Sequence, residues 1–471
     1  MLLDPKYGVC YRLAMAREYY FISDLHIGGD GALDECEFEE EIIAFLRMLE
    51  AEAGDAELII AGDMLGLWET TTISGPDKLH ATIASHLDLF HQFKQTGSRM
   101  RITAIPGNHD HELATNAEFG AILAGYNIHL EAREFITRPL GRRTLWIEHG
   151  HQHDAYNRFE DFGNRACNPL GYYVTSGIIS GAGQRARNRH EKWLRDIESV
   201  YPTEYVPHWL FSNYFYREMK TYIRVIGLPF LLAFSTSALL VIGALLELGG
   251  LVAPGRILSS FTRWFGSPGY LLDTLFLVDA FAFVALVLFA LPLLLIRHDL
   301  RKVLLRYNFD LSQALTVEKE NEYGAAAARV FRERPDVAVF VFGHTHAASL
   351  RLDGARAILN TGAWIKRLTR VPSRFFLLPD VYCPSYQLGY FRLRECPGGI
   401  AIQYRNIEKK ASESLSLLQR FSIYRQRPGS PSAIPEETIV PDEPDAASDS
   451  GPVLRPAGKA ESASPALCVR A

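Results

Sequence analysis

Cysteine is scarce in this chain, and no two cysteines form a C-x-x-C pair. The 471 residues contain six cysteines far apart in the sequence, Cys10, Cys36, Cys167, Cys383, Cys396 and Cys468. This scatter argues against a disulfide framework and is typical of a protein in a reducing compartment. The first ten residues also lack an unbroken apolar segment, so we expect no cleaved secretory signal.

An excess of positive charge is absent as well. The formal net charge is −5, from 49 Lys and Arg against 54 Asp and Glu, and the sequence pI is about 6.3. Without a global positive field, a general role in coating nucleic acid is disfavoured. A composition of 48% hydrophobic and 22% charged residues is that of a chain that folds around a core.

Two blocks of the chain show the alternation of strands and helices. The first predicts strands at 19–23, 58–61 and 102–105, with helices at 37–53 and 77–94; the second predicts a helix at 317–332, a strand at 337–342 and hairpins at 350–359 and 388–404. The strand runs are apolar on both faces, as in a sheet covered by helices. We therefore predict an α/β domain in two parts, residues 19–165 and 311–406.

Two long apolar runs interrupt these blocks. Residues 225–246 contain no charge, and at 1.5 Å per residue they span the roughly 30 Å hydrocarbon core of a bilayer. A second run, at about 274–296, is broken only by Asp279 and Pro292. The pattern predicts a transmembrane helical hairpin within an insertion at 166–310. The alternative is a very apolar hairpin or lid in a protein that does not enter a membrane.

Charge around the hairpin predicts its orientation. The connection between the runs carries only Arg256 and Arg263, whereas the outer flanks are richer in Lys and Arg, at Arg217, Lys220, Arg224, Arg297, Arg301, Lys302 and Arg306. Positive residues stay on the cytoplasmic side, so we expect a multi-pass protein of the inner (cytoplasmic) membrane with its globular part facing the cytoplasm.

Two further segments, one before the first apolar run and one at the end of the chain, differ in composition from the two blocks. Residues 184–224 mix basic and aromatic side chains, which suits a headgroup-level segment, although a solvated helix with docked aromatics fits equally well. Residues 426–471 are rich in Pro, Ser, Ala and acidic residues, and this composition predicts a disordered tail.

Polar motifs follow the predicted strands in a fixed order. They are Asp24-Leu25-His26, Gly62-Asp63, Gly107-Asn108-His109-Asp110, His149-Gly150-His151 and Gly343-His344-Thr345-His346. Each motif alone is a weak signal, but strand ends in an α/β protein meet at one rim, where these side chains would converge. Carboxylate, amide and imidazole donors suit divalent ions such as Mn, Fe and Zn, and a carboxylate such as Asp63 can bridge two ions about 3.5–4 Å apart.

This ordered set resembles the calcineurin-like metallophosphoesterase family over residues 19–405, apart from the insertion. The resemblance implies a four-layer α/β sandwich, two mixed sheets flanked by helices, around two divalent metal ions, Mn first, with Fe or Zn as alternatives. Carried over by position, it implies one ion held by Asp24, His26, Asp63 and His346 and a second held by Asp63, Asn108, His149 and His344.

The resemblance also implies roles for neighbouring residues. His109 would donate a proton to the leaving oxygen or steady the transition state, with Asp110 orienting its ring; a purely structural His109 is the alternative. His151, His153 and Asp154 are either outer supports of the site, substrate contacts or solvated loop residues. Trp68 completes a G-D-x-x-x-x-W pattern similar to the UDP-2,3-diacylglucosamine hydrolase branch, but that branch usually has Arg at the position of His109 and a shorter insertion. The segment 360–364 is expected to support His344 and His346.

These observations predict a membrane-anchored phosphoesterase that hydrolyses a phosphate ester or pyrophosphate bond with a metal-bridging hydroxide. Its partners would be a phosphorylated small molecule or a lipid substrate, and the membrane. The alternative is a membrane scaffold or sensor that keeps the metal-binding fold with little turnover. A nuclease is disfavoured, because no basic track with interleaved aromatics lies outside the membrane-proximal stretch. The pattern leaves open the substrate, the choice between monoester, diester and pyrophosphate, and the oligomeric state.

Overall fold

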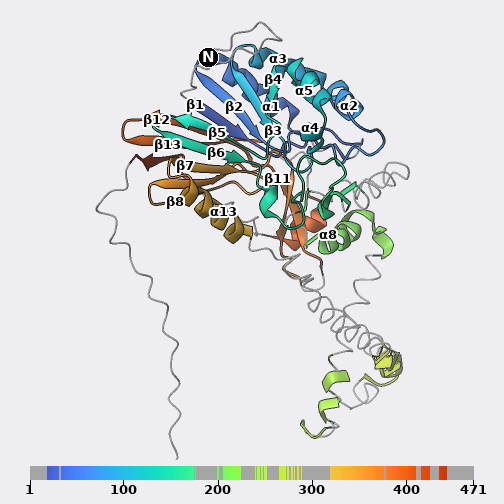
Figure 1. Cartoon of the computed structure of the whole chain (residues 1–471). Coiled ribbons are helices and arrows are strands. Elements are labelled where there is room, and N and C mark those ends of the chain that lie inside the picture. The colour runs from blue at the N-terminus through green and yellow to red at the C-terminus, as the bar shows by residue number, and fades with distance from the viewer. Residues whose placement is uncertain are drawn as a thin grey trace, which may run out of the picture.

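The computed structural model describes residues 18–176, 199–200, 205–223, 319–375, 378–409, 415–424 and 434–442, with short pieces between residues 239 and 288. Within the first of these ranges, residues 31, 32, 35, 53 and 174 are left out of the description. Two β-sheets lie against each other, and helices cover their outer faces (Figure 1).

The larger sheet has seven strands in the order β14-β13-β12-β1-β2-β3-β4. β1 to β4 are parallel, and β12 joins antiparallel to β1. The strands predicted near 19–23, 58–61 and 102–105 are confirmed. The seven strands are β1 (Glu18–Ile22), β2 (Ala56–Ala61), β3 (Arg101–Ile105), β4 (Ile128–Leu130), β12 (Leu388–Cys396), β13 (Gly399–Ile407) and β14 (Glu437–Pro441).

The smaller sheet has five strands in the order β5-β6-β7-β9-β8. All six residues of the central strand β7 are buried, which explains its unbroken apolar sequence. β6 and β7 come from opposite sides of the insertion and pair in parallel. The five strands are β5 (Phe135–Leu140), β6 (Arg143–Glu148), β7 (Val337–Phe342), β8 (Ser349–Asp353) and β9 (Arg356–Asn360).

Three apolar clusters define four layers. One cluster lies between the two sheets, with Phe21, Ile59 and Val341 among its members. A second joins the larger sheet to the helices above it, and a third joins the smaller sheet to the helix below it (Figure 1). The helices are α1 (Glu39–Ala51), α2 (Asp77–Ser85), α3 (Leu87–Gly97), α4 (Glu112–Thr115) and α5 (Ala117–Ala124) over the larger sheet, and α13 (Lys319–Glu333) over the smaller one. The predicted sandwich of two mixed sheets flanked by helices is confirmed.

The single helix predicted at 77–94 is two helices, α2 and α3. The backbone leaves the helical region at His86, whose φ is −126° and ψ is 44°. The buried imidazole lies between two carboxylates, with Nδ1 2.7 Å from Glu39 Oε2 and Nε2 2.9 Å from Asp34 Oδ2. Burial opposes the charge of this ring, but both carboxylates outweigh it and raise the pKa of His86 to about 9. Contacts from distant residues therefore break a helix that the local pattern predicts to continue.

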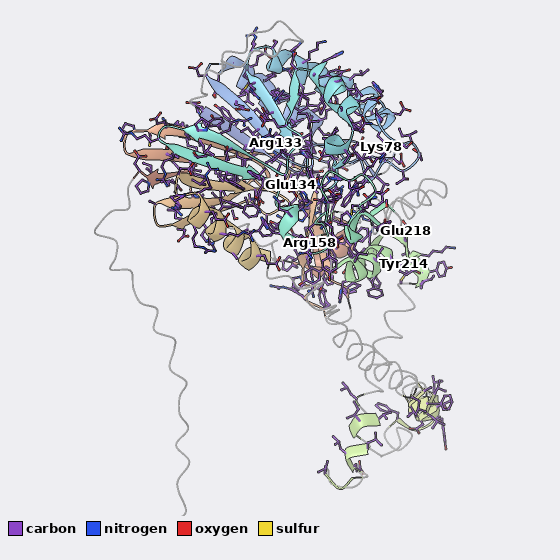
Figure 2. The ribbon with its side chains drawn as sticks, in the orientation of Figure 1. Lys78, Arg133, Glu134, Arg158, Tyr214 and Glu218 are labelled. Carbon is purple, nitrogen blue, oxygen red and sulfur yellow. The ribbon has the colours of Figure 1, made fainter. Side chains whose placement is uncertain are left out.

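A small assembly lies beside the sandwich. The hairpin β10 (Arg367–Val371) and β11 (Val381–Ser385) packs against α8 (Val206–Asn213), the π-helical turn η6 (Tyr214–Glu218) and α14 (Leu417–Ser422). Trp209, Phe215 and Tyr216 are buried here, whereas Phe211 and Tyr214 are 61% and 43% exposed. Figure 2 shows Tyr214 at the margin of this region. The structure describes part of the predicted headgroup-level segment. This part is a helix with docked aromatic side chains, and it also exposes other aromatic rings at its surface.

The two predicted membrane spans lie largely outside the described residues. A search of the residues that are described finds no helix with both the length and the apolarity of a bilayer crossing. The charge-free run at 225–246 and the run at 274–296 are represented there only by short pieces.

The predicted disordered tail needs one correction. Residues 437–441 form strand β14, which pairs antiparallel with β13 at the edge of the larger sheet. Val440 is 1% exposed and belongs to the cluster between the sheets. A β-branched pair, Ile439 and Val440, within an otherwise polar stretch explains this pairing. Residues 425–433 and 443–471 lie outside the described residues.

Candidate metal centre

Five of the seven predicted metal ligands have a left-handed backbone. The φ angles are 53° at Asp24, 45° at His26, 49° at Asp63, 67° at His344 and 55° at His346. Residues with a Cβ rarely adopt this conformation, which costs on the order of 1–3 kcal/mol each and gathers at functional sites. One other non-glycine residue of the described chain, Asn127, shares it. The strained backbone positions therefore coincide with five of the seven predicted metal ligands.

The ligands lie in the turns that follow β1, β2, β3, β6 and β7, at one rim of the two sheets. Backbone hydrogen bonds join these turns to one another: His26 N donates to Asp63 O at 3.0 Å, and Gly343 N donates to His149 O at 2.9 Å. Because the turns are tied directly to each other, the positions of the side chains depend on both sheets.

Glycines in these turns leave room for the ligands. A Cβ at Gly107 would lie 2.2 Å from Asp63 Oδ1, and a Cβ at Gly62, where φ is 92°, would lie 2.3 Å from His149 Nδ1. Any side chain at either position would displace a predicted ligand.

Three groups of donor atoms lie at this rim; one joins His26 to Glu69 and His109, and the other two consist entirely of predicted ligands. Asp24, His26 and His346 form one group and Asp63, His149 and His344 the other, with the donor atoms of each group within 4.8 Å of one another. His346 Nε2 is 3.2 Å from Asp24 Oδ1, and His149 Nε2 is 3.0 Å from Asp63 Oδ2.

Asp63 and Asn108 complete the arrangement. Asp63 Oδ2 lies 3.8 Å from His26 Nε2 of the first group as well as 3.0 Å from His149, so this carboxylate faces both groups. Asn108 Oδ1 is 3.1 Å from His149 Nε2. The structure therefore brings together all seven residues that the sequence assigned to metal binding.

Buried polar atoms without a hydrogen bond point into this space. Within the described residues, Asp24 Oδ1, His26 Nε2 and Asp63 Oδ2 are buried and make none. An unsatisfied buried polar atom costs about 1–3 kcal/mol, more if charged, so such atoms call for a binding partner. Carboxylate and imidazole donors of this kind are what a divalent cation binds, and the residues present fit the two-ion centre.

The charges of these groups are perturbed. Burial opposes the charge on His149, but Asp63 and Asp24 outweigh it and raise its pKa to about 10. Burial and the neighbouring His109 lower the pKa of His26 to about 4. Burial works against ionised Asp63, yet His149 and His109 hold its pKa well below the usual value. Because a ligand imidazole must be neutral, cation binding at His149 has to release a proton.

Glu69, rather than Asp110, orients His109. His109 Nδ1 lies 2.6 Å from Glu69 Oε1, whereas the Asp110 carboxylate accepts backbone N–H groups of Gly107 at 2.7 Å and Leu65 at 3.2 Å. The predicted role of Asp110 toward the ring is therefore wrong: Asp110 shapes the turn instead. Burial opposes the imidazolium, but Glu69 and Asp63 outweigh it and raise the pKa of His109 to about 9.

The three residues of the loop after His149, His151, His153 and Asp154, have different surroundings. Asp154 is buried, with Oδ2 3.1 Å from His344 Nε2, so it supports a predicted ligand. His153 Nε2 contacts Glu148 Oε1 at 2.6 Å, away from the donor groups. His151, in the short turn η2 (His151–His153), is fully buried, and neither ring nitrogen has a hydrogen-bond partner among the described residues.

The segment 360–364 supports the site as expected. Asn360 Nδ2 donates to Thr345 Oγ1 at 2.7 Å, within the turn that carries His344 and His346. Ser23 Oγ lies within hydrogen-bonding distance of the Asp24 carboxylate and of Gly362 O, and Trp364 N donates to Asp24 O at 3.2 Å.

Comparison with known proteins agrees with this geometry. A family model described as calcineurin-like phosphoesterase matches residues 19–225, a range that includes Asp24, Asp63 and His149 and ends before His344. No curated protein matches the chain significantly.

Among solved structures, a similar one is a conserved uncharacterized protein of Streptococcus pneumoniae TIGR4 described as a predicted phosphoesterase. It is 9% identical, with 83% of this chain and 89% of that chain covered and a TM-score of 0.24, too low for a common superposition. The family model and the ligand pattern, complete at one rim of the fold, therefore identify a calcineurin-like phosphoesterase domain at residues 19–225, and domains of this family are hydrolases that act on phosphoester bonds.

Proposed function

We propose that this chain hydrolyses a phosphate ester or pyrophosphate bond with two divalent cations. The observation that carries the proposal is the convergence of Asp24 Oδ1, His26 Nε2 and Asp63 Oδ2, buried and without hydrogen bonds, on one space. A scaffold without turnover is disfavoured, because no residue of the family's ligand pattern is missing here.

The donor set favours particular ions. Asp24, His26, Asp63 and His346 would hold one cation, and Asp63, Asn108, His149 and His344 the other. No cysteine belongs to either described group, and oxygen with imidazole donors favours Mn, with Fe or Zn as alternatives. When bound, two such ions supply charge stabilisation for phosphoryl oxygens and lower the pKa of a water molecule.

His109 would serve the leaving oxygen. Its ring lies 4.5 Å from the His26 ring, centroid to centroid, so it stands beside the donor groups. Glu69 occupies Nδ1, which leaves Nε2 as the nitrogen that can face a substrate. Without metal, Glu69 and Asp63 raise the pKa of His109 to about 9, and the contact with Glu69 favours the protonated ring that a proton donor needs.

An activity screen tests this proposal. Full-length protein loaded with Mn is assayed against phosphate monoesters, diesters and pyrophosphates, each in soluble and lipid-linked form. We expect hydrolysis of at least one class, and its loss when a chelator removes the metal. If no class is hydrolysed after reconstitution with Mn, Fe or Zn, the proposed activity is wrong.

We also propose that the insertion anchors the protein in the inner membrane, with the catalytic domain in the cytoplasm. At described positions of the two apolar runs, Val241 is buried, whereas the other large apolar side chains are 41% to 77% exposed: Leu239, Ile242, Leu245, Leu246, Leu277, Val278, Phe281, Val284 and Leu288. Apolar surface of this extent is rare on proteins that do not bind a partner or a membrane. Exposed Phe211 and Tyr214 lie shortly before the first run, where aromatic rings favour the interface. A lipid-linked substrate would suit this placement.

Reporter fusions test the topology. We expect a reporter fused after Ala253, in the connection between the runs, to be active only on the far side of the membrane, because the basic flanks stay in the cytoplasm. A reporter fused after Asp442 should report the cytoplasm and serves as the matched control. A cytoplasmic signal from the Ala253 fusion would contradict the hairpin.

A further inference from the structure

A pocket lies near the metal centre, and Trp68 contacts both. Its volume is about 330 Å³, within the range of small-molecule sites. Trp68 lines the pocket, and its ring lies 4.4 Å from the His109 ring, centroid to centroid. His109 itself does not line the pocket, so Trp68 stands between His109 and the cavity. An organic group that extends past Trp68 from a leaving oxygen beside His109 would enter the pocket.

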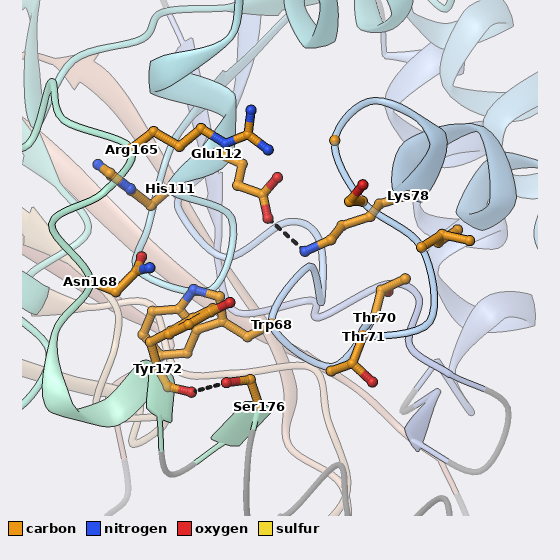
Figure 3. Close-up of a pocket in the computed structure, with 13 residues that line it drawn as sticks. Trp68, Thr70, Thr71, Lys78, His111, Glu112, Arg165, Asn168, Tyr172 and Ser176 are labelled. Atoms are coloured by element: carbon orange, nitrogen blue, oxygen red, sulfur yellow. Dashed lines mark hydrogen bonds and ion pairs between the residues drawn. The ribbon is translucent and has the colours of Figure 1, made fainter.

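The lining is mostly polar. Thr70, Thr71, Ser74, Asn168 and Ser176 offer hydroxyl and amide groups, and Trp68 and Tyr172 form an aromatic edge, with ring centroids 5.7 Å apart (Figure 3). The hydroxyls of Thr70 and Ser176 already donate to Gly66 O and Tyr172 O, so they offer acceptor oxygens to a ligand, which an acyl chain cannot use. The pocket therefore suits a ligand with hydroxyl groups.

A buried lysine extends into this pocket. Lys78 is 7% exposed, and its Nζ donates to Leu67 O at 2.8 Å and to Glu112 Oε1 at 2.6 Å. An ammonium has three N–H donors, and the described residues supply these two acceptors. Figure 3 shows Lys78 reaching toward Glu112 across the cavity. The third donor is available to a ligand.

The Lys78–Glu112 pair has the pattern that a hydroxyl group needs. Lys78 offers a donor, and Glu112, which uses Oε1 for Lys78, offers Oε2 as an acceptor beside it. A hydroxyl both donates and accepts, so two neighbouring hydroxyls match the pair. Arg165 also lines the pocket, so its charged side chains are two cations and one carboxylate. The Lys78–Glu112 pair therefore selects a ligand by its hydrogen-bonding pattern rather than by its charge.

We infer that this pocket binds the leaving group of the substrate, and that this leaving group carries neighbouring hydroxyls. Sugars and glycerol share this chemistry. The inference rests on the proposed phosphoesterase function and adds the class of alcohol that the reaction releases: water attacks phosphorus, the P–O bond to the alcohol breaks, and the alcohol oxygen receives the proton.

Kinetics with the Mn-loaded full-length protein test this inference. The substrates are phenyl phosphate, glucose 1-phosphate and glycerol 3-phosphate, each as the monoester and as the methyl diester. Lys78→Met should lower kcat/KM for the glucose or the glycerol ester at least tenfold more than for the phenyl ester, about the effect of one charged hydrogen bond. Glu112→Gln, which keeps the shape of the side chain, should change the ratio in the same direction.

Lys366→Met is the matched control, because Lys366 is also buried and paired with a glutamate, with Nζ 3.1 Å from Glu37 Oε1, but does not line the pocket. This control should leave the substrate ratio unchanged. An equal decrease for all three esters in both pocket variants would overturn the inference while leaving the phosphoesterase function intact.

Direct binding separates the two proposals. Saturation-transfer NMR with metal-free protein should detect methyl glucoside or glycerol, and Lys78→Met should remove the signal while Lys366→Met retains it. Binding without hydrolysis of any ester would contradict the proposed function and support the pocket. If neither polyol binds the wild-type protein, the pocket inference is wrong.

Discussion

Asp63→Asn is expected to lower kcat/KM by roughly a thousandfold or more, because it removes the one carboxylate that faces both donor groups. An amide carries no charge to offset two cations, and it offers a single oxygen where the carboxylate offers two. Metal analysis of the purified variant should show fewer bound ions per chain than the wild type.

Asparagine is the replacement that preserves the fold. Asp63 has a φ of 49°, and Asn tolerates this left-handed backbone better than Ala does. Its Oδ1 can still accept the His109 backbone N–H, which lies 2.8 Å from Asp63 Oδ1. Because His149 and His109 hold the pKa of Asp63 low, removing this paired charge should lower the Tm of the metal-free protein at neutral pH, so activity and metal content are compared well below that Tm.

Asp336→Asn is the matched control for Asp63→Asn. Asp336 lies at the start of β7 and pairs with Arg334 on the surface, far from the donor groups, so this variant should retain activity and metal. If Asp63→Asn keeps wild-type turnover and metal content, Asp63 does not bridge two ions.

His109→Ala is expected to lower kcat about 10²- to 10³-fold while metal content stays at the wild-type value. The ring is absent from the predicted ligand set, and the hydrogen bond from residue 109 to Asp63 uses the backbone N–H, which alanine keeps. The decrease should be smaller for esters of p-nitrophenol than of aliphatic alcohols, because the former leave without a proton. An equal decrease for both kinds of ester would argue against proton donation.

Glu69→Gln tests the contact that orients His109. We expect about a tenfold decrease in kcat, and the double variant with His109→Ala should be no worse than His109→Ala alone, because Glu69 acts through the ring. If the effects of the two substitutions multiply in the double variant, and Glu69→Gln also loses bound metal, Glu69 is instead a metal ligand. That outcome has a basis in the structure, since Glu69 Oε2 is buried without a hydrogen bond and near His26.

Much of the donor set could be predicted because Asp24, Asp63 and Asn108 follow the apolar runs of three parallel neighbours, which bring their turns to one rim. His149 follows β6, which was not predicted, and its assignment came from the ordered motif set that resembles the family. Glu69 was not predicted, because it follows Trp68 in an irregular segment. The folded path of that segment brings Glu69 into contact with His109. For the same reason Asp110, adjacent in sequence, was assigned a contact that Glu69 makes.

The strands that could be predicted are those whose apolar runs are buried on both faces of a sheet. β5 and β6 were not predicted, because their exposed and buried residues mix polar with apolar types. The break between α2 and α3 depends on Asp34 and Glu39, both far from His86 in sequence. β14 was not predicted, because it lies in a polar tail and pairs with β13 through a long-range contact that local composition does not encode.

The division of the sandwich across the insertion has a consequence for biosynthesis. β1 has β2 on one side and β12 on the other, and β6 has β5 on one side and β7 on the other. When the ribosome has made residues up to 165, both sheets still have an open edge, and such edges invite wrong pairing. In the proposed arrangement the apolar hairpin enters the bilayer during this interval, so the nascent first half is already held at the membrane surface when β7 and β12 emerge to close it.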